Sequence, residues 1–314
     1  MTILVTGCTG TIGSQVVERL AGKGVQIRAM ARDPSKVKAA AGLEPVKGDM
    51  TDVASLRAAL KGVDTLFLLN AVTADEATQA LLALDLAREA GVGGIVYLSV
   101  LNSAQFEDVP HFASKHLAER AIDAHGIPAT VLRASYFMQN DLMFRDALKA
   151  GFYPQPIGNV GVAMVDVRDI ADAAVAELLL RERSQHPLPR TTIDVVGPET
   201  LTGTDIAAIW TSILGREVRY GGDDLDAFEA QAAQMIPGWM AHDMRVMLRA
   251  FQRFGMVPGI DARATVEGVI GHPLRTLPRL REGGRGGVVM TRAFGDNSAV
   301  RRASCLPRRE RRSA

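Results

Sequence analysis

Short runs of apolar residues alternate along most of the chain with longer stretches in which apolar residues recur every three or four positions. The apolar runs are typical of buried strands, and they lie at 2–6, Val25–Ala31, Leu43–Lys47, Thr65–Leu69, Gly94–Ser99, Ala129–Arg133 and Thr192–Val196. The longer stretches are typical of helices, and they include Val53–Leu60, Asp75–Glu89, Phe112–His125 and Val167–Leu180. Strands that alternate with helices favour a parallel sheet covered on both faces. We therefore expect an α/β fold with a doubly wound parallel sheet.

The pattern changes after Val196, where helical periodicity replaces the alternation. An apolar stripe predicts a helix that ends at Gly215, and it consists of Ile206, Ile209, Trp210, Ile213 and Leu214. Residues 224–255 are also expected to be largely helical, and they carry several methionines, with Met256 just beyond. Methionine side chains can line an adaptable pocket, but they more often form core. The sequence thus predicts a second, smaller and mainly helical part.

The first predicted strand runs directly into three glycines at fixed spacing. Glycines permit a tight turn and close approach of the backbone to a ligand, and the helix that follows directs free N–H groups toward phosphates. A glycine-rich turn without a ligand is the plainer interpretation, but the order of strand, glycines and helix favours a site for a dinucleotide pyrophosphate. The contacts are expected from Gly7, Thr9, Gly10, Thr11, Ile12 and Gly13.

Length and composition fit an enzyme-sized protein of one large domain or two, with 314 residues of which 47% are hydrophobic. No apolar stretch reaches the roughly 18 residues of a membrane span. The first strand begins at Thr2 and leaves no room for a signal peptide, so we expect a cytoplasmic location and no membrane partner. Two cysteines, Cys8 and Cys305, make no disulfide framework. We expect no metal ion.

Basic residues concentrate at the end of the chain. Residues 281–314 hold nine arginines and three acidic residues, whereas the rest of the chain is mildly acidic. A basic tail can bind nucleic acid, but this segment shows neither a helical nor a strand period. We therefore expect residues 283–314 to be disordered. Nucleic acid is not the expected partner, because the body of the chain lacks a basic face or an aromatic platform.

A set of further motifs accompanies the glycines. They are Arg32-Asp33-Pro34, Gly48-Asp49-Met50, His111-Phe112-Ala113-Ser114-Lys115 with Glu119, Gly126-Ile127-Pro128, and Phe137-Met138-Gln139-Asn140. Together they resemble the NmrA-like group of atypical short-chain dehydrogenases/reductases. The resemblance implies a Rossmann domain at 1–197, a small substrate domain at 198–282, and a contribution of 137–160 to the latter. That family contains NAD(P)H-dependent quinone and other reductases as well as redox-sensing regulators that bind NAD(P).

The end of the second predicted strand bears on which dinucleotide is bound. NAD sites usually carry an acidic residue there for the ribose hydroxyl, whereas an arginine suits the 2′-phosphate of NADP. Arg32 therefore favours NADP, while Asp33 would repel a phosphate and keeps NAD as the second choice. The plainer interpretation of Arg32 is a solvated surface charge. By analogy with the family, Asp49 and Met50 lie beside the adenine, and Leu69 and Asn70 lie beneath the nicotinamide half.

The expected chemical centre departs from the short-chain dehydrogenase pattern. That pattern places a tyrosine four residues before a lysine on one helix face, but here His111 precedes Lys115. Lys115 can still hold the ribose hydroxyls. The candidate proton donors are His111, whose imidazole gives and takes protons near neutral pH, Ser99 by family analogy, and Tyr136 at the carboxyl edge of the sheet. In the plainer interpretation, His111 only begins a helix and Tyr136 only packs beneath the substrate domain.

These features favour an NAD(P)H-dependent reductase of a small, electron-poor acceptor such as a quinone or a conjugated carbonyl. Such an acceptor takes hydride readily and can collect its proton from water, so the missing tyrosine does not exclude an enzyme. The alternative is a non-catalytic NAD(P)-binding redox sensor. Cys8 could sense oxidation, although a small buried side chain is the plainer interpretation. We expect a small-molecule substrate, bound by residues of 137–160 and 224–256, and a monomer or homodimer.

Overall fold

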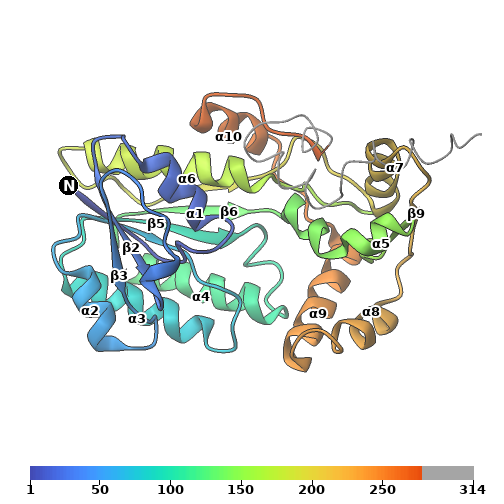
Figure 1. Cartoon of the computed structure of the whole chain (residues 1–314), viewed down its shortest axis with the longest axis horizontal. Coiled ribbons are helices and arrows are strands. Elements are labelled where there is room, and N and C mark those ends of the chain that lie inside the picture. Colours follow the sequence, from blue (N-terminus) through green and yellow to red (C-terminus); the bar gives the residue numbers. More distant parts are fainter. Residues whose placement is uncertain (278–314) are drawn as a thin grey trace, which may run out of the picture.

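The computed structural model describes residues 1–277 of the chain. Within them, seven parallel strands form one sheet in the order β3-β2-β1-β4-β5-β6-β8 (Figure 1). The strands are β1 (Thr2–Val5), β2 (Gln26–Ala31), β3 (Leu43–Lys47), β4 (Thr65–Leu68), β5 (Gly94–Val100), β6 (Ala129–Ala134) and β8 (Thr191–Val195). The expected α/β fold with a doubly wound parallel sheet is confirmed. The strand order reverses at β1, which pairs with β2 on one side and β4 on the other, and ligands bind at such a switch point.

Helices cover both faces of the sheet (Figure 1). One face carries α1 (Gly13–Leu20), α6 (Val167–Arg183) and α10 (Ala262–Ile270), and the other carries α2 (Val53–Leu60), α3 (Glu76–Glu89) and α4 (Pro110–Ala124). Successive strand residues alternate between the two cores: Ile3 and Val5 pack into the first, and Leu4 packs into the second. Because both of their faces are buried, the central strands β1, β4, β5 and β6 are nearly continuous apolar runs, whereas the edge strand β3 is largely exposed.

A second group of elements lies at one end of the sheet (Figure 1). It comprises η2 (Met138–Phe144), α5 (Arg145–Lys149), β7 (Phe152–Tyr153), α7 (Gly203–Leu214), β9 (Arg219–Tyr220), α8 (Leu225–Ala232) and α9 (Gly238–Phe254). The helix predicted to end at Gly215 is α7, whose first turn is closed by a capping box between Thr202 and Asp205. The division into domains at 1–197 and 198–282 stays a prediction. The tail predicted to be disordered, 283–314, lies outside the described residues, as does Cys305.

The stretch 224–255 is helical in two pieces, α8 and α9, with a break before α9. Met235 lies in this break and is 70% exposed, whereas Met247 and Met256 are buried in the core. Thus the methionines of this region do not share one environment. The buried ones fit the plainer interpretation, and the exposed one follows from the interruption of the helix, which the sequence pattern did not predict.

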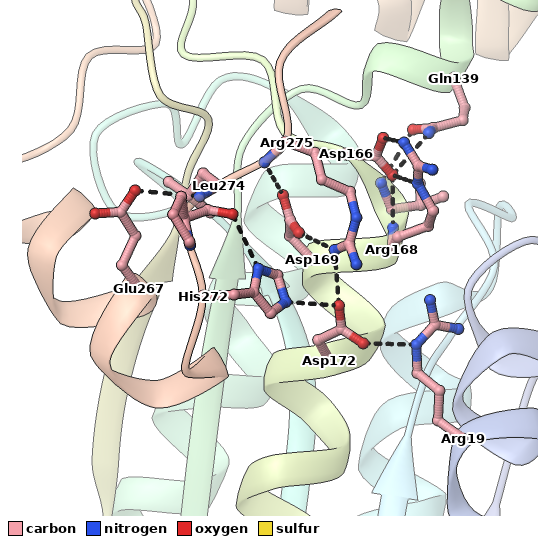
Figure 2. A network of polar contacts seen from close by, with 12 residues as sticks. Arg19, Gln139, Asp166, Arg168, Asp169, Asp172, Glu267, His272, Leu274 and Arg275 are labelled. Atoms are coloured by element: carbon pink, nitrogen blue, oxygen red, sulfur yellow. Dashed lines mark hydrogen bonds and ion pairs between the residues drawn. The ribbon is translucent and has the colours of Figure 1, made fainter. Parts of the chain in front are cut away.

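A network of charged side chains fastens α6 to α1 and to the segment after α10 (Figure 2). Asp172 on α6 accepts hydrogen bonds from Arg19 Nε of α1 at 2.6 Å and from Arg275 Nη1 at 2.7 Å. Arg275 also donates to the buried carboxylate of Asp169, and His272 Nε2 lies 3.1 Å from Asp172 Oδ2. The network therefore anchors the C-terminal turn of α1, the helix that follows the glycines.

Candidate active site

The glycine loop joins β1 to α1 at the switch point of the sheet. Gly7 has φ of +61°, a left-handed conformation that favours glycine, and Gly10 N donates to Gly7 O at 3.0 Å. A Cβ atom on Gly13 would lie 2.2 Å from Gly7 O. Gly13 is therefore required for α1 to start this close to the end of β1, which is the packing role of the third glycine in dinucleotide-binding loops.

Backbone N–H groups of this loop are available to a ligand. Thr9, Gly10 and Thr11 are exposed. Within residues 1–277, the N–H groups of Thr9, Thr11 and Ile12 donate to no backbone acceptor, and no side chain caps the start of α1. Unsatisfied donors at a helix N-terminus attract anions. The loop thus has the donor set that a pyrophosphate requires.

Arg32 and Asp33 follow directly after β2, and both are exposed. The Asp33 carboxylate accepts hydrogen bonds from Ser35 N at 3.1 Å and Ser35 Oγ at 2.6 Å, which lowers its pKa below the ordinary value. It caps the short helix η1 (Pro34–Lys36). Arg32 has no hydrogen bond or ion pair within the described residues, so its guanidinium remains available to an external phosphate. The Asp33 carboxylate, which we expected to repel a phosphate, is thus hydrogen-bonded within its own turn.

Asp49 and Met50 follow β3, beside the end of β2. Asp49 Oδ1 accepts from Thr51 N at 2.9 Å and from Thr51 Oγ1 at 2.8 Å. These bonds, and more weakly the positive charge of Arg32, hold the pKa of Asp49 below its ordinary value. Met50 is half-buried and packs against the core between the sheet and α2 and α3. The two strand ends therefore bring Asp49 into the electrostatic range of Arg32.

Leu69 and Asn70 follow β4, on the other side of β1. Leu69 N donates to Thr6 Oγ1 at 2.8 Å, which ties the two strand ends together. Asn70 is 5% exposed, yet neither its Oδ1 nor its Nδ2 has a hydrogen-bond partner within residues 1–277. A buried amide without partners costs free energy. An amide in this state fits a position that a bound ligand satisfies, and together with the close-packed glycine loop it makes the residues compatible with a dinucleotide.

Lys115 and its partner Glu76 form a buried ion pair between α4 and the first turn of α3. Lys115 Nζ lies 2.5 Å from Glu76 Oε1. Burial raises the pKa of Glu76, while the nearby Lys115 ammonium opposes that rise. The second carboxylate oxygen, Oε2, has no partner among the described residues. Glu76 thus holds the ammonium that the resemblance assigns to the ribose hydroxyls.

His111, four residues before Lys115, is bound by a carboxylate from α9. Its Nδ1 lies 2.6 Å from Asp243 Oδ2, and its backbone N–H donates to Asp243 Oδ1 at 3.2 Å. Both side chains are buried, with Asp243 only 1% exposed. His111 does stand in the first turn of α4, as the plainer interpretation expected. It also belongs to a carboxylate–histidine pair that the sequence did not reveal.

Ser99 and Tyr136 are engaged elsewhere. The hydroxyl of Ser99 donates to the buried carboxylate of Glu119, which also accepts hydrogen bonds from two side-chain nitrogens of Arg133. Tyr136 Oη accepts from Gln155 Nε2 at 2.6 Å, and burial raises its pKa above the ordinary value. Within residues 1–277, no hydrogen bond joins Ser99 or Tyr136 to His111 or Lys115. Of the three candidate proton donors, the structure therefore links only His111 to the helix face of Lys115.

Cys8 is a buried thiol beneath the glycine loop. Its Sγ donates to Met30 O at 3.1 Å, and burial raises its pKa to about 11. A protonated, buried thiol reacts slowly with oxidants. The interpretation of Cys8 as a small buried side chain is confirmed.

Another cluster could be mistaken for a metal centre. Ligand atoms of Asp169, Asp172 and His272 lie within 4.8 Å of one another. The guanidinium of Arg275 donates to both carboxylates (Figure 2). A cation of the protein itself thus neutralises this cluster, which we interpret as an ion-pair network.

Sequence reasoning missed Glu76 and Asp243. An acidic residue in a first helical turn is ordinary, because it complements the helix dipole, so Glu76 gave no distinct signal. Asp243 did give a signal in the sequence. It precedes Val246 and Met247 by three and four residues, and therefore lies on the buried face of α9. A carboxylate on an apolar helix face needs a partner.

Comparison with known proteins identifies the group to which this arrangement belongs. A model of the NmrA-like family matches residues 1–270. The chain belongs to the NmrA-like family. The resemblance inferred from the motifs is thus confirmed, and with it a Rossmann-type fold for binding NAD(P).

Individual relatives of this NmrA-like protein are reductases. It is 31% identical over 281 residues to an NAD(P)H azoreductase of Xenophilus azovorans, covering 88% of this chain and 95% of that one. It is also 31% identical over 277 residues to a (4-alkanoyl-5-oxo-2,5-dihydrofuran-3-yl)methyl phosphate reductase of Streptomyces griseus, and this match covers 87% of this chain and 94% of the relative. The crystal structure of an NADPH-dependent quinone oxidoreductase of Escherichia coli complexed with NADPH is similar, with a TM-score of 0.77 and 28% identity. That match covers 89% of this chain and 98% of the quinone oxidoreductase. No helix within residues 1–277 has the length and apolar character needed to span a bilayer.

Proposed function

We propose that this NmrA-like protein is an NADPH-dependent reductase of a small, electron-poor acceptor such as a quinone or a conjugated carbonyl. The observation that carries the proposal is the glycine loop, whose exposed N–H groups and close-packed Gly13 suit a pyrophosphate. The named activities of the relatives support the same class, because azo compounds and quinones are both electron-poor acceptors.

Each part of the cofactor has candidate partners in the chain. The backbone of 7–13 would hold the pyrophosphate, Arg32 the 2′-phosphate, and Lys115 the ribose hydroxyls. Asp49 and Met50 would flank the adenine, and Leu69 and Asn70 the nicotinamide. When bound, the reduced nicotinamide supplies the hydride. We favour NADPH over NADH because Arg32 is unpaired within the described residues while Asp33 is bound to Ser35.

The ion pair with Glu76 is compatible with this role of Lys115. An ammonium has three N–H donors, and the structure shows one of them on Glu76 Oε1. Two donors remain for hydroxyl groups. Glu76 would therefore keep the ammonium charged and oriented, with the lysine still able to contact a ribose.

The absence of a tyrosine at His111 argues against simple exchange between an alcohol and a ketone. An acceptor that takes hydride readily places less demand on a strong acid. We propose that the substrate binds between the nucleotide domain and residues of 137–160 and 224–256, and that the protein acts in the cytoplasm as a monomer or homodimer.

Turnover with a panel of acceptors tests the proposal. The purified protein is mixed with NADPH and, in turn, quinones, azo dyes, enals and aldehydes, and the loss of reduced nicotinamide is followed by absorbance. Binding of NADPH and NADP⁺ is titrated alongside. Turnover of at least one electron-poor acceptor is expected. No turnover, together with clearly different affinities for the two cofactor forms, would replace the reductase by a redox sensor.

A further inference from the structure

We propose that Asp243 is a positioning residue for His111, and that the two form a carboxylate–histidine dyad that protonates the reduced acceptor. This inference rests on the proposed reductase function. Asp243 belongs to none of the motifs that point to the family, and it reaches His111 across 132 positions of the sequence.

The contacts of Asp243 fix both the place and the tautomer of the imidazole. One carboxylate oxygen accepts the backbone N–H of His111, which is one of the donors left without a partner in the first turn of α4. The other oxygen lies 2.6 Å from Nδ1. An ionised carboxylate only accepts hydrogen bonds, so Nδ1 must carry a proton. Within residues 1–277, Nε2 has no hydrogen-bond partner, and it is the nitrogen left for a substrate.

The surroundings of the ring restrain it further. The ring of Phe112 meets the imidazole edge-on, with centroids 4.7 Å apart and planes at 88°. Three groups act electrostatically on the Glu76 carboxyl of α3: Lys115 and His111 from α4, and Asp243 from α9. These four side chains therefore form one electrostatic cluster. Within it, an imidazolium at His111 together with the Lys115 ammonium would balance the charges of the two carboxylates.

Protonation of the reduced acceptor breaks one bond in the dyad and forms one bond on the acceptor. An acceptor that has gained a hydride carries one more negative charge than before. The Nε2–H bond of the His111 imidazolium then breaks, its proton forms an O–H bond on the reduced acceptor, and the electron pair stays on Nε2. Asp243 remains ionised and keeps the Nδ1 proton in its hydrogen bond throughout. Water returns a proton to Nε2 before the next cycle.

Kinetics of three variants test the dyad. Asp243→Asn keeps the shape of the side chain and an oxygen for the His111 N–H, but its amide can donate to Nδ1 and so favours the other tautomer. We expect kcat with a panel acceptor to fall about tenfold or more, with little change in KM or in NADPH affinity. The double variant with His111→Phe should be no slower than His111→Phe alone, because Asp243 acts only through the ring. A merely structural role would make the two losses multiply.

A control variant separates the dyad from loss of a carboxylate elsewhere in the chain. Glu89 Oε2 lies 3.0 Å from Arg57 Nη2 in an exposed ion pair that joins α3 to α2. Glu89 is at the opposite end of α3 from Glu76, so Glu89→Gln removes that pair without touching the candidate site, and its kcat should equal that of the wild type. A fall in kcat equal to that of Asp243→Asn would overturn the specific role of Asp243.

NMR of protein containing isotope-labelled histidine nitrogens gives a readout that needs no turnover. The His111 signal, assigned by its absence from His111→Phe, should show the neutral ring protonated at Nδ1 in the wild type and at Nε2 in Asp243→Asn. A wild-type ring protonated at Nε2 overturns the dyad even where Asp243→Asn does not fold. If the wild type reduces acceptors but Asp243→Asn matches it in kcat, the dyad fails alone. If the wild type reduces no acceptor, the reductase proposal fails, and the proposed role of the dyad fails for the same reason.

Discussion

Lys115 on α4 and Glu76 in the first turn of α3 form a buried ion pair, with Lys115 Nζ 2.5 Å from Glu76 Oε1. Glu76 opens the helix that follows β4, and Lys115 lies in the second turn of the helix that follows β5. Removing two charges from water is costly, and their attraction offsets that cost only while both are present. The pair therefore makes the geometry of Lys115 depend on a residue from a neighbouring helix.

Glu76→Gln should destabilise the protein because it leaves the Lys115 ammonium buried without a counter-charge. We expect the free energy of unfolding to fall by about 3 kcal/mol, measured by urea denaturation. The combined change Glu76→Gln with Lys115→Met removes both charges and should cost less than Glu76→Gln alone. A Glu76→Gln protein as stable as the wild type would contradict this account of the pair.

Arg32→Glu should weaken NADPH binding by about 2 kcal/mol or more, because an attraction to the 2′-phosphate becomes a repulsion. NADH binding should change little, since NADH lacks that phosphate. Titration of both cofactors measures the difference. Arg88→Glu, an exposed arginine on α3 that pairs with Asp85, serves as the control and should leave both affinities unchanged. Equal losses for the two cofactors at Arg32 would rule against NADP.

Gly13→Ala should disrupt the glycine loop, because the added Cβ would lie 2.2 Å from Gly7 O and force α1 away from β1. We expect loss of NADPH binding and a stability loss of about 2 kcal/mol, the size typical of overpacking. Gly268→Ala in the interior of α10 meets no atom within 4 Å and should be neutral or stabilising by up to about 1 kcal/mol. Calorimetric unfolding and cofactor titration of both variants check this contrast.

Asp141 should make stability depend on pH. Its carboxyl is fully buried and accepts from Trp210 Nε1 and Tyr153 Oη, and burial raises its pKa to about 7. Between an unfolded pKa of about 4 and this value, only the folded protein keeps the proton, so stability should fall as pH rises, by at most about 1.4 kcal/mol per pH unit, and level off above the folded pKa.

Asp141→Asn removes this titration while keeping an acceptor for Trp210. The variant should lose less stability than the wild type between about pH 5 and pH 8, and should be the more stable of the two at the upper end. Urea denaturation across this range measures both curves. Parallel curves for the two proteins would show that Asp141 is not the group responsible.

The centre of the sheet was predictable because β1, β4, β5 and β6 are buried on both faces and are therefore nearly continuous apolar runs. The glycine loop was predictable for a similar reason, since the conformation of Gly7 and the contact between Gly13 and Gly7 arise within one short segment. In such cases the residues that determine a feature are neighbours in the sequence, and a pattern of spacing is enough to reveal it.

The partners of the candidate site residues were not predictable in this way. The carboxylate that binds His111 comes from α9, and the one that binds Lys115 comes from α3. Periodicity places Asp243 on a buried helix face, but it does not show which residue either carboxylate meets, because that depends on how helices distant in the sequence pack. Ser99 shows the same limit: the family resemblance suggested chemistry for it, whereas its contact with Glu119 is visible only in the folded chain.

The contact of Arg275 with Asp169 and Asp172 has a consequence for proteolysis. A protease that cut the backbone between Ile270 and Arg275 would release this cation from α6 and leave Arg19 as the remaining arginine bound to Asp172 within the described residues. Arg19 is in the last turn of α1, whose first turn carries the nucleotide loop. The cut would leave the buried Asp169 carboxylate of α6 without this cation, which destabilises the helix against which α1 packs. Bound cofactor, which stabilises the folded protein, should in turn protect the cleavage site.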